Sequence, residues 1–186
     1  MKINKILVNE TMEEEGLDLF RKEGIELDLE KKDSDELLEK ISEYDALIVR
    51  SKTKVGPDII EAGAKGNLKM IGRSGVGYDN VDVEFAEEHG IIVKNAPHGN
   101  TNATAEFAFG SMLSLARNIP QSYASLKDGK WLKSQYMGVE LSHKTLGIFG
   151  YGRIGEQLHN LSRGFDMKVI VYDLFPKKDK GITYLS

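Results

Sequence analysis

Residues 145–155 hold the pattern that most constrains the fold of this 186-residue chain. A short apolar run, Thr145–Phe149, leads directly into Gly150-x-Gly152-x-x-Gly155, and a helical pattern starts there. In such a turn the first glycine permits a tight bend, the second lets a pyrophosphate approach the backbone, and the third lets the helix pack against its strand. The free N–H groups at the start of the helix favour a bound phosphate. The segment therefore predicts the dinucleotide-binding unit of a doubly wound α/β domain.

An acidic residue after this turn bears on the choice of cofactor. A second apolar run, Lys168–Tyr172, ends at Asp173, 21 residues after Gly152, which is the spacing expected for an acid that binds adenosine ribose hydroxyls. A carboxylate there repels a 2′-phosphate, so we expect NAD rather than NADP, with the reservation that Lys177 and Lys178 would offset the repulsion. The predicted cofactor-binding residues are Gly150, Gly152, Arg153, Ile154, Gly155 and Asp173. The alternative is a structural turn that binds no cofactor.

The first 97 residues alternate short apolar runs with helical segments. The runs are spaced about 20 residues apart, as in consecutive βα units of a parallel sheet. They are Lys5–Val8, Ile25–Leu29, Ala46–Val49, Lys69–Ile71 and Ile91–Val93. A segment rich in Pro, Gly and Asn follows at residues 95–101 and predicts a domain boundary. We therefore expect a flavodoxin-like domain over residues 1–97 and the first part of a Rossmann domain over residues 98–186.

Composition excludes several classes of function. The chain has no cysteine, which excludes disulfides and thiolate metal sites, and no group of residues is spaced as metal ligands. The net charge is −4, which argues against a nucleic-acid partner. No apolar run is long enough to span a bilayer, and the N-terminus has no signal-peptide pattern, so we expect a cytoplasmic protein. Residues 1–97 carry −8 and residues 98–186 carry +4, which suits an anionic ligand on the second part or reflects chance.

Four motifs together resemble a known family. They are Arg73–Asp82, Asn95–Thr101, Leu115–Pro120 and Gly150–Gly155, and their order and spacing resemble the D-isomer-specific 2-hydroxyacid dehydrogenases, in particular the phosphoglycerate-type branch. The resemblance implies two doubly wound domains and NAD-dependent oxidation of a small 2-hydroxy acid. For that branch the reaction is 3-phosphoglycerate to 3-phosphohydroxypyruvate, the entry to serine synthesis.

The resemblance also implies substrate-binding residues. Arg50 and Ser51 match a loop pair in which the arginine meets the substrate phosphate, and a guanidinium does suit a phosphate or carboxylate. Gly75, Val76 and Gly77 match a loop whose backbone amides hold the substrate carboxylate. Asn100 matches a hinge residue near substrate and cofactor. The alternatives are a solvated surface charge for Arg50 and a helix cap for Asn100.

The catalytic residues that the resemblance implies have no match in this chain. A later arginine that polarises the carbonyl, and a histidine oriented by a glutamate, are expected beyond residue 186. The histidines at 89, 98, 143 and 159 are better interpreted as ordinary surface or helix-end residues. We therefore expect a truncated chain that is inactive alone. The alternatives are a non-enzymatic NAD-sensing module, as in a corepressor branch of the family, and a fragment that binds nothing.

One helical segment predicts an interface. Residues Thr101–Arg117 are apolar on all sides, which is unusual for a surface helix. The resemblance implies homodimers formed through the cofactor domain, and this helix with the loop to Trp131 is the expected contact.

Overall fold

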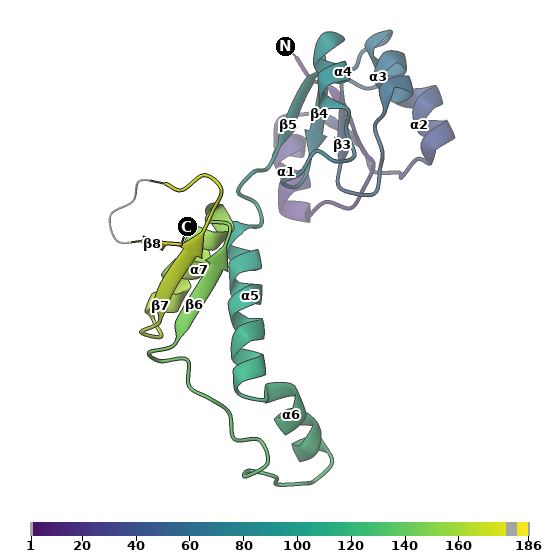
Figure 1. Cartoon of the computed structure of the whole chain (residues 1–186). Coiled ribbons are helices and arrows are strands. Elements are labelled where there is room, and N and C mark those ends of the chain that lie inside the picture. Colours follow the sequence, from purple (N-terminus) through teal and green to yellow (C-terminus); the bar gives the residue numbers. More distant parts are fainter. Residues whose placement is uncertain (1, 178–181, 186) are drawn as a thin grey trace. The chain divides into compact units, whose positions relative to one another are not determined.

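The computed structural model describes residues 2–177 and 182–185. The chain divides into two units, Met1–Gly99 and Asn100–Ser186, and each is described by itself (Figure 1). The division falls in the loop between the last strand of the first unit and the first helix of the second. The boundary predicted at residue 97 lies in that same loop.

Unit 1 is built on a parallel sheet of five strands with the order β2-β1-β3-β4-β5. This is the flavodoxin-like order, in which the connections reverse direction between β1 and β3. The strands are β1 (Lys5–Val8), β2 (Glu26–Asp28), β3 (Ala46–Val49), β4 (Met70–Arg73) and β5 (Ile92–Asn95). The helices are α1 (Glu14–Lys22), α2 (Ser34–Lys40), η1 (Ile41–Glu43), α3 (Pro57–Ala64) and α4 (Val83–Glu88). The α/β fold class expected from the sequence is confirmed.

Local sequence signals set several helix ends in unit 1. Pro57 occupies the first turn of α3, where its missing N–H has no intrahelical partner to lose. The Asp82 carboxylate accepts the Phe85 N–H at the start of α4. Gly90 follows α4 with φ of +75°, a left-handed conformation that glycine adopts without steric cost. Each of these helix ends is therefore set by a single residue close to it.

Both faces of the sheet in unit 1 are buried. Leu7 packs with residues of α2, η1, α3 and α4 in the larger cluster, whereas Ile6 and Val8 pack with Leu17 of α1 in the smaller one. Successive strand residues point to opposite faces, so an uninterrupted apolar run fills both clusters. This packing explains why the strands of unit 1 have apolar runs rather than strict alternation.

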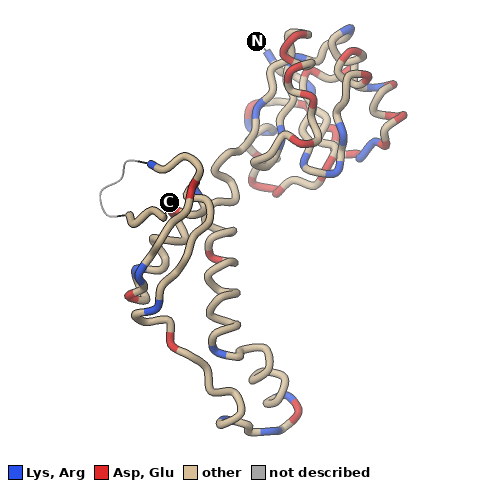
Figure 2. The backbone as a smooth tube through the Cα atoms, in the orientation of Figure 1, with Lys and Arg blue, Asp and Glu red and all other residues tan. Residues whose placement is uncertain are grey.

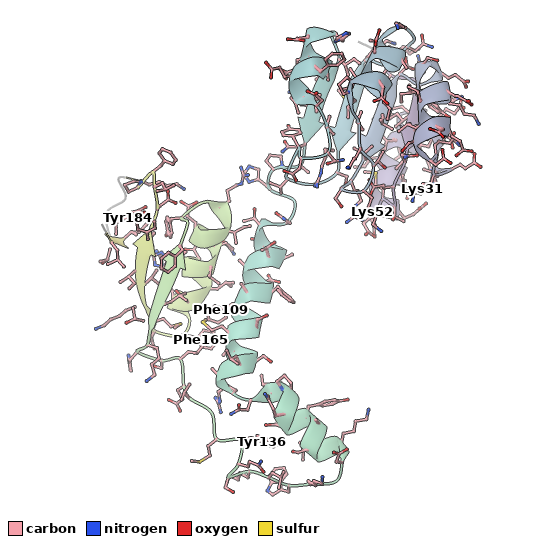
Figure 3. The ribbon with its side chains drawn as sticks, turned by 45° about the vertical axis from the view of Figure 1, so that its right-hand side comes forward. Lys31, Lys52, Phe109, Tyr136, Phe165 and Tyr184 are labelled. Atoms are coloured by element: carbon pink, nitrogen blue, oxygen red, sulfur yellow. The ribbon has the colours of Figure 1, made fainter. Side chains whose placement is uncertain are left out.

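Unit 2 has a smaller parallel sheet with the order β6-β7-β8. The strands are β6 (Thr145–Phe149), β7 (Lys168–Tyr172) and β8 (Thr183–Tyr184), and the helices are α5 (Thr101–Ala116), α6 (Ile119–Lys127) and α7 (Arg153–Arg163). Helices α5 and α7 pack against each other, and the Phe109 and Phe165 rings meet at 4.9 Å (Figure 3). The sheet core holds Ile148, Tyr151 and Val171.

Helix α5 is almost free of charge along its length, as the tan tube in Figure 2 shows. It buries Ala105 and Phe109, but Phe107 and Leu115 are 78% and 79% exposed. The apolar residues therefore extend around the helix beyond the strip that α7 covers. A surface of this kind typically binds another protein surface.

Asp45 joins the amino ends of three strands in unit 1. It is 8% exposed, its carboxylate accepts N–H groups from Asn4 at 2.8 Å and Lys5 at 3.1 Å, and it lies 2.6 Å from Lys69 Nζ. The hydrogen bond from Lys69 and the two backbone donors lower the pKa of Asp45 from 3.8 to about 2. The ionised carboxylate therefore stabilises the folded unit.

We predict that Asp45→Asn lowers the free energy of unfolding of unit 1 by about 1–3 kcal/mol at pH 7, because an amide leaves part of this donor set unsatisfied. The native pKa of Asp45 is depressed, so its contribution is present above pH 4 and is lost as the pH falls toward 2. The difference between wild type and variant should therefore shrink over that range. Urea unfolding followed by the NMR signals of β1 and β3 measures it, and a difference that does not change between pH 5 and pH 2 would contradict this account.

Candidate functional site

The glycine turn lies between β6 and α7 in unit 2. Gly150 has φ of +91°, which a residue with a side chain rarely adopts, and its N–H donates to the Tyr172 carbonyl at 2.8 Å. Gly152 is the N-cap residue of α7 with extended backbone, φ of −81° and ψ of −163°. No side chain in the described part of the chain caps this helix end. The N–H groups of its first turn are therefore available to an acceptor from outside.

The second and third glycines of the turn have different surroundings. A Cβ atom on Gly155 would lie 2.5 Å from the Gly150 carbonyl oxygen and 3.3 Å from Ile148 Cγ2. A Cβ atom on Gly152 would meet no atom within 4 Å. Gly155 is thus needed for the packing of α7 on β6, whereas the open space at Gly152 fits a ligand that approaches the backbone.

The Asp173 carboxylate is directed at the turn. It follows β7, and one of its oxygens accepts the N–H of Tyr151, the residue between the first two glycines. The other oxygen accepts the Phe175 N–H at 2.7 Å. The Phe175 N–H, and to a smaller extent the Tyr151 N–H, hold the pKa of Asp173 below its usual value. The carboxylate therefore stays ionised. A carboxylate has about four acceptor sites, so two remain for hydroxyl groups.

The remaining predicted cofactor residues lie in the first turn of α7. Arg153 is exposed and Ile154 is 37% exposed, so neither is committed to the core. Lys177, which would offset repulsion of a 2′-phosphate, instead places its Nζ 2.8 Å from Glu156 Oε1. Lys178 lies outside the described residues.

Tyr151 and His159 form a contact that the sequence argument missed. Tyr151 is 5% exposed, and its hydroxyl lies 2.6 Å from His159 Nδ1. His159 was interpreted as an ordinary helix residue, yet it lies on α7 and holds the Tyr151 side chain of the glycine turn. Tyr151 and His159 are eight residues apart, and this spacing matches no known sequence motif. Only the structure therefore reveals the contact.

The predicted substrate residues of unit 1 gather at the carboxyl edge of its sheet. Arg50 and Ser51 directly follow β3, and Gly75–Gly77 follow β4, which pairs with β3 in parallel. Parallel strands end at the same edge, and ligands of open α/β sheets bind at that edge. Unit 1 thus brings these five residues to one edge, whereas Asn100 begins unit 2. Asn100 occupies the N-cap position of α5 but forms no side-chain cap hydrogen bond.

Two residues hold the loop after β3 and were also missed. One Glu10 oxygen accepts the N–H groups of Arg50, Lys52 and Thr53 at 2.9–3.1 Å. Burial raises the pKa of Glu10, but these backbone donors outweigh it and leave that pKa below its usual value. The Asn80 side chain donates to the carbonyls of Arg50 and Thr53. Glu10 lies two residues after the end of β1, and its position near a predicted strand end was the available signal.

The loop after β4 is shaped by Gly75 and a neighbouring arginine. Gly75 has φ of +156°, and a Cβ atom there would overlap Arg73 Nη1 at 1.6 Å. Arg73 Nε is buried and has no partner among the described residues. The Asn95 side chain donates to the Val76 carbonyl. The loop therefore combines glycine backbone with a guanidinium, a combination that suits an anionic ligand.

Of the other histidines, His98 is exposed in the turn after β5, and His89 and His143 have local hydrogen bonds. His89 closes α4, with Nδ1 2.8 Å from the Phe85 carbonyl oxygen, and stacks on the Phe85 ring. His143 has φ of +61° and donates its N–H to the Asp166 carbonyl. Within the described ranges no three His, Asp or Glu residues form a group that could hold a metal ion. No helix of the described ranges is both long and apolar enough to cross a membrane.

The family model for the catalytic domain of D-isomer specific 2-hydroxyacid dehydrogenases matches residues 6–166. The chain belongs to this family. The D-3-phosphoglycerate dehydrogenase of Archaeoglobus fulgidus is 45% identical over 178 residues, which are 95% of this chain and 33% of the relative. The hydroxypyruvate reductase of Thermotoga maritima is 44% identical over 98% of this chain and 60% of its own length. The chain thus spans about a third of the length of the first relative and three fifths of the length of the second.

A solved structure supports the same fold. D-2-hydroxyisocaproate dehydrogenase superposes with a TM-score of 0.85 at 27% identity, over 98% of this chain and 57% of that one. The flavodoxin-like order of unit 1 and the glycine turn of unit 2 therefore lie within a fold that this dehydrogenase family uses.

The two glycines give a matched pair of variants. We predict that Gly155→Ala lowers the free energy of unfolding of unit 2 by about 1–3 kcal/mol, because its Cβ overlaps the Gly150 carbonyl. Gly152→Ala should change that free energy by less than about 1 kcal/mol, because the site is open and φ is negative. Urea unfolding followed by the NMR signals of β6 and β7 measures both, and equal losses would show that the turn packs differently.

Proposed function

We propose that this chain comprises the substrate-binding domain, residues 1–97, and the first part of the NAD-binding domain, residues 98–186, of an NAD-dependent D-2-hydroxyacid dehydrogenase. The proposed reaction is the oxidation of 3-phosphoglycerate to 3-phosphohydroxypyruvate in serine biosynthesis. Family membership and the 45% identical D-3-phosphoglycerate dehydrogenase support it. The observation that carries the cofactor assignment is the Asp173 carboxylate held at the glycine turn by the Tyr151 N–H.

The cofactor would bind to chain groups of known geometry. The uncapped first turn of α7, with Gly150, Gly152, Arg153, Ile154 and Gly155, takes the pyrophosphate, because free N–H groups and the helix dipole favour negative charge. Asp173 accepts the adenosine ribose hydroxyls and repels a 2′-phosphate, while Lys177 is paired with Glu156. Bound NAD supplies the hydride acceptor.

The substrate would bind to the carboxyl edge of unit 1. Arg50, oriented by its N–H bond to Glu10, binds the phosphate with Ser51 beside it. The amides of Val76 and Gly77 bind the carboxylate, because the Gly75 N–H already donates to the Arg73 carbonyl at 2.8 Å, and Arg73 adds positive charge next to them. Asn100 is proposed to bind the substrate. These groups bind and orient an anionic substrate, and none of them exchanges a proton with the reacting hydroxyl.

We propose that the groups that move the proton and polarise the carbonyl are not among these 186 residues. The local role of the His89 ring supports this, since its Nδ1 lies 2.8 Å from the Phe85 carbonyl oxygen. The chain alone should therefore bind ligands without turnover. The second candidate is a non-enzymatic NAD-sensing module, which the exposed apolar surface of α5 favours.

The proposed partners and location follow from the same assignment. We propose a homodimer formed through unit 2, with Phe107 and Leu115 of α5 and Trp131 at the contact, because these side chains are largely exposed. The protein is proposed to act in the cytoplasm on a small-molecule substrate, with no nucleic acid and no membrane as partner.

Isothermal titration of the purified chain tests the cofactor assignment. We expect NAD to bind more tightly than NADP, and Asp173→Asn to weaken NAD binding about tenfold and to reduce the preference, because hydrogen bonds to a charged acceptor contribute about 1.5–3 kcal/mol. Asp128→Asn, the same charge change at the end of α6, is the control and should bind as wild type. No NADH should form with 3-phosphoglycerate.

Three results would overturn parts of this proposal. Equal NAD affinity in Asp173→Asn and Asp128→Asn would remove the role of Asp173. Tighter binding of NADP would overturn the choice of cofactor. NADH formation at ordinary enzyme rates would show that the chain carries its own acid–base group.

A further inference from the structure

An ion pair in unit 2 joins the loop that follows β7 to the start of α7. Asp173 begins this loop, and Lys177, four residues later, places its Nζ 2.8 Å from Oε1 of Glu156 in the first turn of α7. The pair therefore connects the two segments that the proposed cofactor site uses, the loop that carries the ribose-binding carboxylate and the helix start that faces the phosphates.

Two further contacts fix the position of Lys177. Its N–H donates to the hydroxyl of Tyr184 at 3.2 Å, and its Nζ lies 5.9 Å from the centroid of the Tyr151 ring, within the range of a cation–π contact. Tyr184, labelled in Figure 3, lies on β8, and its ring meets the Tyr151 ring edge-on with the centroids 6.2 Å apart. The lysine is thus held beside the glycine turn by its backbone as well as by its side chain.

The charge of Lys177 acts on Asp173, but its hydrogen bond goes to Glu156. The Phe175 and Tyr151 N–H groups lower the pKa of Asp173 most, and the positive charge of Lys177 adds to their effect. The hydrogen bond to Glu156 is the main cause that raises the pKa of Lys177. A cation near the ribose-binding carboxylate is therefore neutralised by a second carboxylate, which comes from α7.

This neutralisation matters because NAD and NADP differ in one charged group. NADP carries a phosphate at the 2′ position of the adenosine ribose, and sites that accept it supply a cation there. A lysine four residues after Asp173 is such a cation only while its charge is not already paired. Arg153, a second exposed cation at this turn, is assigned to the pyrophosphate that both cofactors share, so it does not distinguish them.

We propose that Glu156 is a specificity-determining residue of the cofactor site, because it holds Lys177 away from the 2′ position of the adenosine ribose. The inference rests on the proposed NAD site and adds a second carboxylate to it. Asp173 binds the ribose hydroxyls and repels a 2′-phosphate, whereas Glu156 acts through Lys177 and removes the cation that would offset this repulsion.

The expected effect is modest in size. The side chains of Lys177 and Glu156 are 49% and 41% exposed, and exposed ion pairs contribute little to stability. One substitution can therefore break the pair without unfolding unit 2. The same weakness limits the change in cofactor preference to a few-fold.

Calorimetric titrations of the full chain with NAD and with NADP test the inference through the ratio of the two dissociation constants. We expect Glu156→Gln to improve NADP binding relative to NAD about three- to fivefold, because it frees Lys177. The double variant Glu156→Gln/Lys177→Gln should have the same ratio as Lys177→Gln alone. Glu61→Gln is the matched control: it breaks an exposed pair with Lys65 of the same 2.8 Å length in unit 1, and should keep the wild-type ratio.

The outcomes separate this inference from the proposed function. If the wild type binds NAD more tightly than NADP and Glu156→Gln has the same ratio, the inference alone is wrong. It is also wrong if both affinities change equally, which shows a purely structural pair, or if the gain persists without Lys177, which shows that Glu156 acts by its own charge. A wild type that binds neither cofactor, or that prefers NADP, overturns the proposed cofactor and this inference together.

Discussion

The hydrogen bond from the Tyr151 N–H to the Asp173 carboxylate is the interaction on which the cofactor assignment depends. It joins the end of β7 to the turn after β6, and so places a negative charge beside the start of α7. A carboxylate and an uncapped helix start attract different parts of one ligand, hydroxyl groups on the first and phosphate on the second. The open space at Gly152 and the close contact at Gly155 give the two glycines separate tasks within this arrangement.

In unit 1 as well, polar side chains next to strand ends form hydrogen bonds that hold the loops where ligands are expected to bind. Glu10 and Asn9 both follow β1, and between them they bind backbone or side-chain atoms of residues 32 and 50–53. Much of the hydrogen-bonding capacity of these two side chains is used to hold the loops.

Much of this fold could be predicted from the sequence because its signals are local. The apolar runs, Pro57, Asp82, Gly90 and the spaced glycines each act within a few residues, and the structure has elements at those positions. The contacts that were missed join residues far apart in the chain or hidden in a turn: Glu10 with the loop forty residues later, and Tyr151 with His159. Lys177 was weighed as a partner of a 2′-phosphate, but its pairing with Glu156 depends on how the loop after β7 folds back. Periodicity and composition carry no information on such pairs.

The central claim is that the turn between β6 and α7 is a dinucleotide site in which Asp173 binds the ribose hydroxyls. A titration of the ¹⁵N-labelled chain with NAD tests it most directly, because each amide reports its own position. The account predicts saturable shifts centred on the amides of residues 150–155 and on Asp173, with the strands of unit 1 unchanged. Shifts that leave this turn unaffected, or no saturable shifts up to millimolar NAD, would contradict it.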